Sequence, residues 1–264
     1  MPELNFHSRP LIGMIHLPPL PGAPRYGGSM EAVFDHALRD AEALSTAGLD
    51  AVLVENFGDV PFPVGAAPPE TVAALAAVTD RVGRSIDLPV GVNVLRNDGR
   101  SALAVAAAAS GDFIRVNVLA WARLTDQGLI EGRAAELMRQ RAALGAEHVL
   151  VLADVSVKHS APLAEVPIAR EAQDLVERAL ADAIVVTGEA TSGAVDLDSL
   201  EQVVRAVDVP VLVGSGVTPR TASHVLGKGC GGAIVGTALM VEGRPGGAID
   251  LDRATRLVAA WRDE

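Results

Sequence analysis

Four ionisable residues that could carry proton-transfer chemistry stand at or just beyond the ends of short apolar runs in this sequence: His16, Glu55, Asp154 and Lys158. A carboxylate or an imidazole can remove a proton from a bound molecule, and a second group can return one elsewhere. A lysine amine can also form a Schiff base if burial lowers its pKa. Because Lys158 stands four residues beyond the run that ends at Asp154, we expect water to reach it, which favours proton transfer.

Further polar residues follow the same apolar runs and could bind a substrate: Asn93, Arg115, Asn117, His159 and Thr187. Burying such a group without a partner costs about 1–3 kcal/mol, so function is the natural reason for a ring of them. Each position also has a structural alternative. His16 could cap a strand, Glu55 and Arg115 could form a bracing ion pair, and the asparagines could hold loops.

Two glycine-containing turns near the end of the chain predict an anion site. Gly214-Ser215-Gly216 and Gly236-Thr237 each follow a β-branched apolar run. Glycine lets backbone N–H groups approach a phosphate closely, and the hydroxyls of Ser215 and Thr237 could donate further hydrogen bonds. The alternative is that these glycines only form tight turns. The phosphate interpretation predicts a small phosphorylated ligand.

Other kinds of site have weak support. We find no Ser-His-Asp arrangement, zinc motif or dinucleotide fingerprint, and Gly227-Lys228-Gly229 lacks the spacing of a P-loop. His16, Glu55 and Asp154 could together hold a divalent cation, but no local ligand spacing marks such a site. We therefore assign no metal ligand, and the cofactor is unknown.

Charge, cysteine content and hydrophobicity exclude several classes of protein. The net charge of −11 argues against binding to nucleic acid, and a single cysteine rules out an internal disulfide. No apolar run reaches the roughly 20 residues that span a bilayer, and Met1–Pro10 lacks the apolar segment of a secretory signal. We expect a cytoplasmic homo-oligomer; peripheral membrane association stays open.

Strands and helices alternate along the chain and must position these residues. The expected strands are β-branched runs bounded by turn residues: Leu11–His16, Ala51–Glu55, Val90–Leu95, Phe113–Asn117, Val149–Asp154, Ala183–Thr187, Val211–Gly214 and Ala233–Gly236. The expected helices are segments of helical period: Met30–Ala47, Glu70–Arg84, Ser101–Ala109, Leu129–Leu144, Pro167–Leu180, Leu197–Ala206, Pro219–Leu226 and Asp250–Trp261. Several of the strands are nearly continuous apolar runs, as expected for parallel strands covered by helices.

Eight such units in 264 residues predict one (β/α)8 barrel domain over residues 1–264. A doubly wound sheet is the alternative, but the count, the chain length and the two glycine turns favour the barrel. The Pro/Gly-rich segments Pro18–Gly28 and Pro61–Pro69 would be long loops at its mouth. Asp50, Asp112 and Asp182 each stand just before a strand. Because barrel active sites lie at the C-terminal ends of the strands, all the candidate residues should meet at one mouth.

Several stretches at these strand ends resemble the BtpA family, which includes the SgcQ-type proteins. The most distinctive are GMIHLPPLPG at 13–22 and VENFGDVPF at 54–62, and the others are GVNVLRND at 91–98, FIRVNV at 113–118, DQGLIEG at 126–132, ADVSVKH at 153–159 and VVTG at 185–188. The resemblance implies a barrel related to phosphate-binding enzymes. It also implies a link either to photosystem I biogenesis or to sugar utilisation, and it transfers no catalytic role to a residue.

Overall fold

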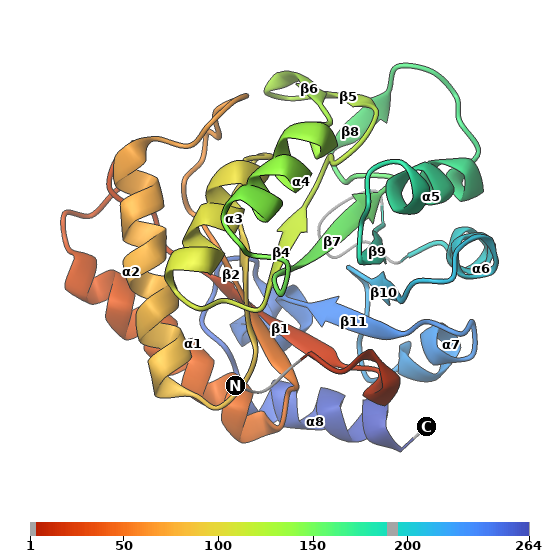
Figure 1. Ribbon diagram of the computed structural model, residues 1–264. Coiled ribbons are helices and arrows are strands. Elements are labelled where there is room, and N and C mark those ends of the chain that lie inside the picture. Colours follow the sequence, from red (N-terminus) through yellow and green to blue (C-terminus); the bar gives the residue numbers. More distant parts are fainter. Residues whose placement is uncertain (1–3, 189–194, 264) are drawn as a thin grey trace.

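Eight parallel strands close into a barrel in the computed structural model, which describes residues 4–188 and 195–263 (Figure 1). The barrel strands are β1 (Leu11–His16), β2 (Ala51–Glu55), β3 (Val90–Asn93), β4 (Phe113–Val116), β7 (Leu150–Val155), β9 (Ala183–Val186), β10 (Val211–Val213) and β11 (Gly232–Val235). They neighbour one another in chain order, and β11 pairs with β1 to close the ring. The predicted (β/α)8 barrel is confirmed.

The strands are buried on both faces, as their apolar sequences predict. Side chains of one face fill the barrel interior, where Phe113, Leu53 and Ile234 belong to one apolar cluster that Leu4 also joins. Gly91 on β3 makes room for the Phe113 ring, since a Cβ atom at this position would lie 2.2 Å from it. Side chains of the other face pack against the surrounding helices in a second, larger cluster.

The helices form the outer layer around the barrel (Figure 1). They are α1 (Met30–Ala47), α2 (Pro69–Ser85), α3 (Gly99–Ala108), α4 (Ala134–Ala143), α5 (Ile168–Glu177), α6 (Leu197–Ala206), α7 (Ala222–Leu226) and α8 (Leu251–Arg262). In α1, for example, Val33, Ala37 and Leu44 lie on the buried face, and Ser29 caps the first turn by accepting a hydrogen bond from the N–H of Ala32.

The aspartates that precede strands bind the backbone of a neighbouring strand. Their carboxylates accept hydrogen bonds at 2.7–2.8 Å, Asp50 from the N–H of Leu11, Asp112 from Val90 and Asp182 from Val151. Each bond satisfies a backbone N–H group near the N-terminal end of a barrel strand, which explains why aspartate recurs at these positions.

The expected helix over Leu129–Leu144 is wrong in its first five residues. A hairpin of β5 (Ala122–Thr125) and β6 (Gly128–Glu131) precedes α4, and β8 (Ser160–Pro162) joins it in a small antiparallel sheet. Figure 1 shows this sheet beyond the ends of β4 and β7. Leu129 is exposed and Ile130 is buried, an alternation that suits a strand rather than a helix.

The expected helix start at Pro219 is also wrong, because α7 begins at Ala222. The hydroxyl of Thr221 accepts a hydrogen bond from the N–H of Thr218 and donates one to the carbonyl oxygen of Gly216. These bonds close a turn that holds residues 216–221 outside the helix.

Candidate active site

A cavity of about 640 Å³ opens at the C-terminal ends of the barrel strands. Most of the residues singled out in the sequence line it: His16, Glu55, Arg115, Asn117, Asp154, Lys158, His159, Gly214, Ser215, Gly216, Gly236 and Thr237. Asn93 and Thr187 are not among the lining residues. Residues more than 200 positions apart therefore share one chamber at the end of the barrel where we expected them.

Arg115 and Asp154 form a buried bidentate ion pair in the wall of the cavity. The guanidinium donates from Nε to Oδ1 at 2.8 Å and from Nη2 to Oδ2 at 3.0 Å. The side chain of Asn117 donates a third hydrogen bond to Oδ2 at 2.8 Å. The sequence suggested Glu55 as the ion-pair partner of Arg115, but the partner is Asp154. Both oxygens of Asp154 face donors, so this carboxylate orients Arg115 and Asn117.

Asn93 and Thr187 lie behind the cavity wall and hold its parts together. The amide of Asn93 donates to the carbonyl oxygen of Arg115 at 3.0 Å. The hydroxyl of Thr187 donates to the carbonyl oxygen of Ser156 at 3.1 Å. These bonds fix the end of β4 and the start of the β7–α5 loop. Both side chains thus bind backbone that supports the cavity wall.

His16 is held in one orientation beside Glu55. Its Nδ1 accepts a hydrogen bond from the N–H of Gly246 at 3.1 Å, and its ring stacks on Phe57 with a centroid distance of 4.2 Å. Burial, together with the charges of Lys158 and Arg115, lowers the pKa of His16 to about 3. His16 is therefore neutral at pH 7, and because Nδ1 is an acceptor, its proton is on Nε2.

Glu55 lies next to this imidazole, with its Oε1 3.6 Å from Nε2 of His16. Burial raises the pKa of Glu55, and the nearby cations Arg115 and Lys158 oppose that shift only in part. A carboxyl group with a raised pKa can donate a proton closer to neutral pH than an exposed glutamic acid can.

Lys158 is half-buried and lines the cavity. Its Nζ donates to the carbonyl oxygen of Gly214 at 2.8 Å, and its own carbonyl oxygen accepts from Nη2 of Arg96 at 2.5 Å. The strand β8 begins two residues later and binds the loop to the small sheet. Burial, followed by the charge of Arg115, lowers the pKa of Lys158 to about 8. The amine lines the open cavity, so the expectation that water reaches it stays a prediction.

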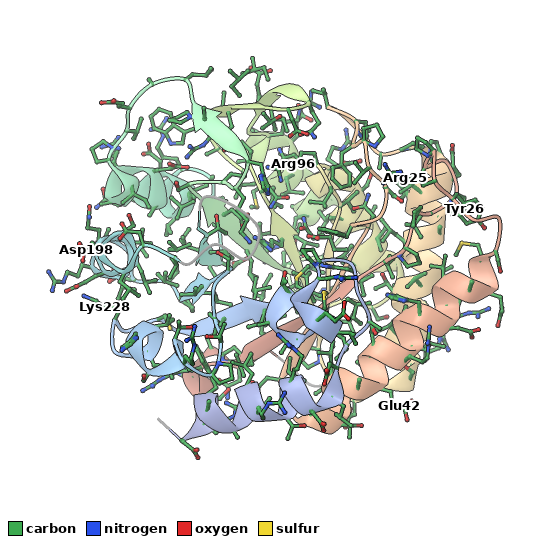
Figure 2. The ribbon with its side chains drawn as sticks, turned by 180° about the vertical axis from the view of Figure 1, so that it is seen from behind. Arg25, Tyr26, Glu42, Arg96, Asp198 and Lys228 are labelled. Carbon is green, nitrogen blue, oxygen red and sulfur yellow. The ribbon has the colours of Figure 1, made fainter. Side chains whose placement is uncertain are left out.

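Arg96 is a cavity residue that the candidate set omitted. It is buried, lines the chamber and stands three residues beyond β3 (Figure 2). The signal was the polar run Arg96-Asn97-Asp98. Asn97 and Asp98 hydrogen-bond the backbone at Val118 and Ala67, which leaves Arg96 as the member of the run that reaches the cavity.

The two glycine turns form another part of the wall. Gly216 has a φ of 72°, and within the described part of the chain the N–H groups of Ser215, Gly216 and Val217 donate no hydrogen bond. The hydroxyl oxygen of Ser215 accepts from the N–H of Gly188 at 2.8 Å. A Cβ atom on Gly236 would lie 3.4 Å from the His16 ring, so this glycine brings the backbone close to the imidazole.

The cavity residues do not form a recognisable metal centre. Over residues 4–188 and 195–263, no three histidine, cysteine, aspartate or glutamate side chains are grouped so that they could hold a metal ion.

Across the same ranges, no helix is both long and apolar enough to cross a membrane.

Fold and site together define a (β/α)8 barrel whose mouth contains a cavity lined by ionisable side chains. The chain belongs to the BtpA family, whose model matches residues 7–263. It is 42% identical over 255 residues to the photosystem I biogenesis protein BtpA of Synechocystis sp., covering 96% of this chain and 88% of that protein. It is 49% identical over 255 residues to an uncharacterized protein of Thermococcus kodakarensis, covering 97% of this chain and 96% of the relative.

Solved structures share the barrel at low sequence identity. Thiamine phosphate pyrophosphorylase from Pyrococcus furiosus superposes with a TM-score of 0.60 at 16% identity, covering 98% of both chains. A geranylgeranylglyceryl phosphate synthase from Thermoplasma acidophilum, in complex with sn-glycerol-1-phosphate, gives 0.61 at 16% identity, covering 97% of this chain and 94% of the synthase. At this identity the likeness establishes the fold alone.

Proposed function

We propose that this protein is an enzyme that uses acid–base chemistry on a small phosphorylated metabolite, derived from a sugar or a nucleotide. The observation that carries the proposal is the composition of one cavity. Glu55, Arg115 and Lys158 line the same chamber as the two glycine turns. A chamber with both anion-binding backbone and perturbed ionisable groups suits catalysis better than a purely structural role.

The phosphate would bind against the turns 214–217 and 236–237. The N–H groups of Ser215–Val217 and Thr237, with the hydroxyls of Ser215 and Thr237, offer donors without adding a formal charge. Arg115 and Arg96 supply positive charge for the rest of an anionic substrate.

Proton transfer would fall to Glu55 and Lys158, with His16 beside them. The raised pKa of Glu55 suits a general acid, and the lowered pKa of Lys158 suits a base. Asp154, at first a candidate for proton transfer itself, would act by orienting Arg115 and Asn117. Asn93 and Thr187 would act from behind the wall, and His159, which is exposed and lines the cavity, would contact substrate.

The structural neighbours support this ligand class at the level of the fold. One neighbour is a thiamine phosphate pyrophosphorylase, and another is a synthase in complex with sn-glycerol-1-phosphate. Phosphate binding by the last two strand–helix loops recurs among (β/α)8 barrels, and these loops carry the glycine turns here.

A thermal-shift screen with pairs of phosphorylated and dephosphorylated sugars and nucleosides tests the proposal. A ligand at 100 times its Kd should add about 2.7 kcal/mol of stability, and only phosphorylated members should do so. Gly236→Val should abolish the shift, because the new side chain enters the space between the turn and His16. Gly27→Val is the matched control, since a Cβ atom there meets nothing within 4 Å. Equal shifts for both members of a pair would contradict the phosphate site.

A second candidate function is assembly of a membrane complex, in line with the name of the Synechocystis relative. The observation that favours it is a pair of exposed leucines, Leu124 and Leu129, which face each other across β5 and β6. An apolar surface of this kind suits contact with a protein or a membrane surface, or with another copy in a homo-oligomer. Replacing both leucines by serine should then abolish binding to vesicles or self-association, while phosphate-dependent thermal shifts stay unchanged.

A further inference from the structure

We propose that Lys158 is a nucleophile that forms an imine with its substrate, which makes the substrate a phosphorylated aldehyde or ketone. This inference rests on the proposed function and specifies its ligand; it gives Lys158 the role of nucleophile in place of that of base and leaves the proton transfers to Glu55. It follows from where the amine is held and from which groups surround it.

The amine lies beside the glycine turn that would bind the phosphate. Nζ of Lys158 donates to the carbonyl oxygen of Gly214 at 2.8 Å, and Gly214 is the first residue of that turn. A ligand whose phosphate contacts the N–H groups of Ser215–Val217 would therefore have its neighbouring carbon atoms close to the amine. Reaction at one of those carbons requires an electrophile, and a carbonyl is the common one in small phosphorylated metabolites.

The loop that carries Lys158 is fixed at several points. Arg96 binds the carbonyl oxygen of Lys158, Thr187 binds that of Ser156, and β8 pairs with β5 directly afterwards. A fixed backbone holds the amine in one region of the cavity, which lowers the entropy lost when it reacts.

The surroundings also favour the nucleophilic form of the amine. Burial and the charge of Arg115 lower the pKa of Lys158 to about 8. About a tenth of such amines are neutral at pH 7, against fewer than about one in a thousand for an ordinary lysine.

The reaction balances with Glu55 as the proton carrier. The lone pair of Nζ attacks the carbonyl carbon, a C–N bond forms, and the oxygen takes the proton of the Glu55 carboxyl. The nitrogen returns a proton to Glu55, which then protonates the hydroxyl as the C–O bond breaks and water leaves. The protonated imine withdraws electrons from the adjacent C–H bond, so the Glu55 carboxylate can remove that proton.

The other lysine of the chain provides an internal control. The sequence contains two lysines, and Lys228 lies on the outside of the molecule (Figure 2). Its Nζ is 2.6 Å from Oε2 of Glu201, and this carboxylate raises the pKa of Lys228. Lys228 should therefore react poorly with carbonyls.

Borohydride trapping of the full chain tests the inference. The protein is incubated at pH 7.5 with dihydroxyacetone phosphate or glyceraldehyde 3-phosphate, reduced with sodium cyanoborohydride, and mapped by peptide mass spectrometry. We expect the adduct mass at Lys158 in at least tenfold excess over Lys228. It should be lost in Lys158→Met, kept in Lys228→Met, and reduced by an excess of inorganic phosphate.

Equal modification of the two lysines, or no modification of Lys158, would overturn the imine. The proposed phosphate site would still stand if inorganic phosphate stabilised the wild type but not Gly236→Val. If Lys158 is instead trapped to the same extent with inorganic phosphate present and in Gly236→Val, the result would support the imine and contradict the phosphate site. If Lys158→Met does not fold, the ratio between the two lysines in the wild type decides the question.

Discussion

At the scale of single residues, the site depends on a buried ion pair whose partners are on adjacent strands. Arg115 on β4 lies opposite Leu152 on β7, so Asp154, two residues further along the strand, reaches the guanidinium from the same face. Glu55 belongs to β2, and β3 separates it from β4. The predicted strand order already placed the Arg115 strand beside the Asp154 strand and not beside the Glu55 strand, because neighbouring strands in a barrel follow sequence order. The pairing with Glu55 was suggested by charge alone.

Asp154→Asn should destabilise the protein, because it leaves the buried Arg115 cation without its counter-charge. Removing one partner of a buried ion pair typically lowers the free energy of unfolding by about 3–5 kcal/mol. The urea midpoint should fall, while Asp80→Asn, which removes an exposed pair with Arg84, should leave it nearly unchanged. A variant as stable as the wild type would contradict a bracing role for the Arg115–Asp154 pair.

Acid should destabilise the protein in part through His16. Its pKa is lowered to about 3 in the folded state from 6.5, so the unfolded chain binds more protons between these values. The stability is therefore complete above pH 6.5 and is lost as the pH falls toward 3. In urea unfolding between pH 7 and 4, His16→Gln should lose less stability than the wild type, and the exposed-site control His148→Gln should match the wild type. Parallel losses in all three proteins would contradict the depressed pKa of His16.

At the scale of elements, the sequence predicted the barrel strands and most helices to within three residues, because their apolar periods are long and clear. It did not predict the small sheet of β5, β6 and β8. Leu129, Ile130 and Leu137 fit a helical period, and β8 is too short to give a period of its own. Its pairing with β5 joins residues that are 35–39 positions apart, which no local sequence pattern reports.

This small sheet should hold the Lys158 loop in place through a second buried ion pair. Nη2 of Arg123 on β5 lies 2.6 Å from the carboxylate oxygens of Glu171 on α5, and the N–H of Ser156 donates to the same carboxylate at 3.4 Å. Arg123→Ala should increase amide hydrogen exchange in 122–131 and 156–162 at least tenfold and lower the trapping of Lys158. Arg133→Ala, which removes an exposed pair with Glu136, should change neither. Unchanged exchange in Arg123→Ala would show that the loop is fixed without the pair.

At the scale of the whole molecule, closure of the ring by β1 and β11 makes each half of the chain depend on the other. Half a barrel would expose the cluster around Phe113 and Leu53 to water. Limited proteolysis should therefore cut first in Pro18–Gly28 or Pro61–Pro69, which contain many exposed residues outside helices and strands. The products should stay associated under native conditions. Two fragments that separate and each remain folded would contradict a single barrel domain.

The same closure explains how the candidate site could be predicted before its contacts were known. Polar residues at the ends of parallel strands must meet at one mouth, so their membership of the cavity follows from the strand positions. Which of them face the cavity and which lie behind it depends on side-chain packing. Asn93 and Thr187 have residue types suited to binding, but their hydrogen bonds point to the backbone of β4 and of the β7–α5 loop.

We propose that the mouth cavity binds a phosphorylated ligand through the glycine turns. A crystal structure with inorganic phosphate, at a concentration that saturates the thermal shift, tests this proposal most directly. We expect a phosphate within hydrogen-bond distance of the N–H groups of Ser215–Val217 and of Thr237, beside His16 and Lys158. A phosphate bound elsewhere, with these N–H groups in contact only with water, would contradict it.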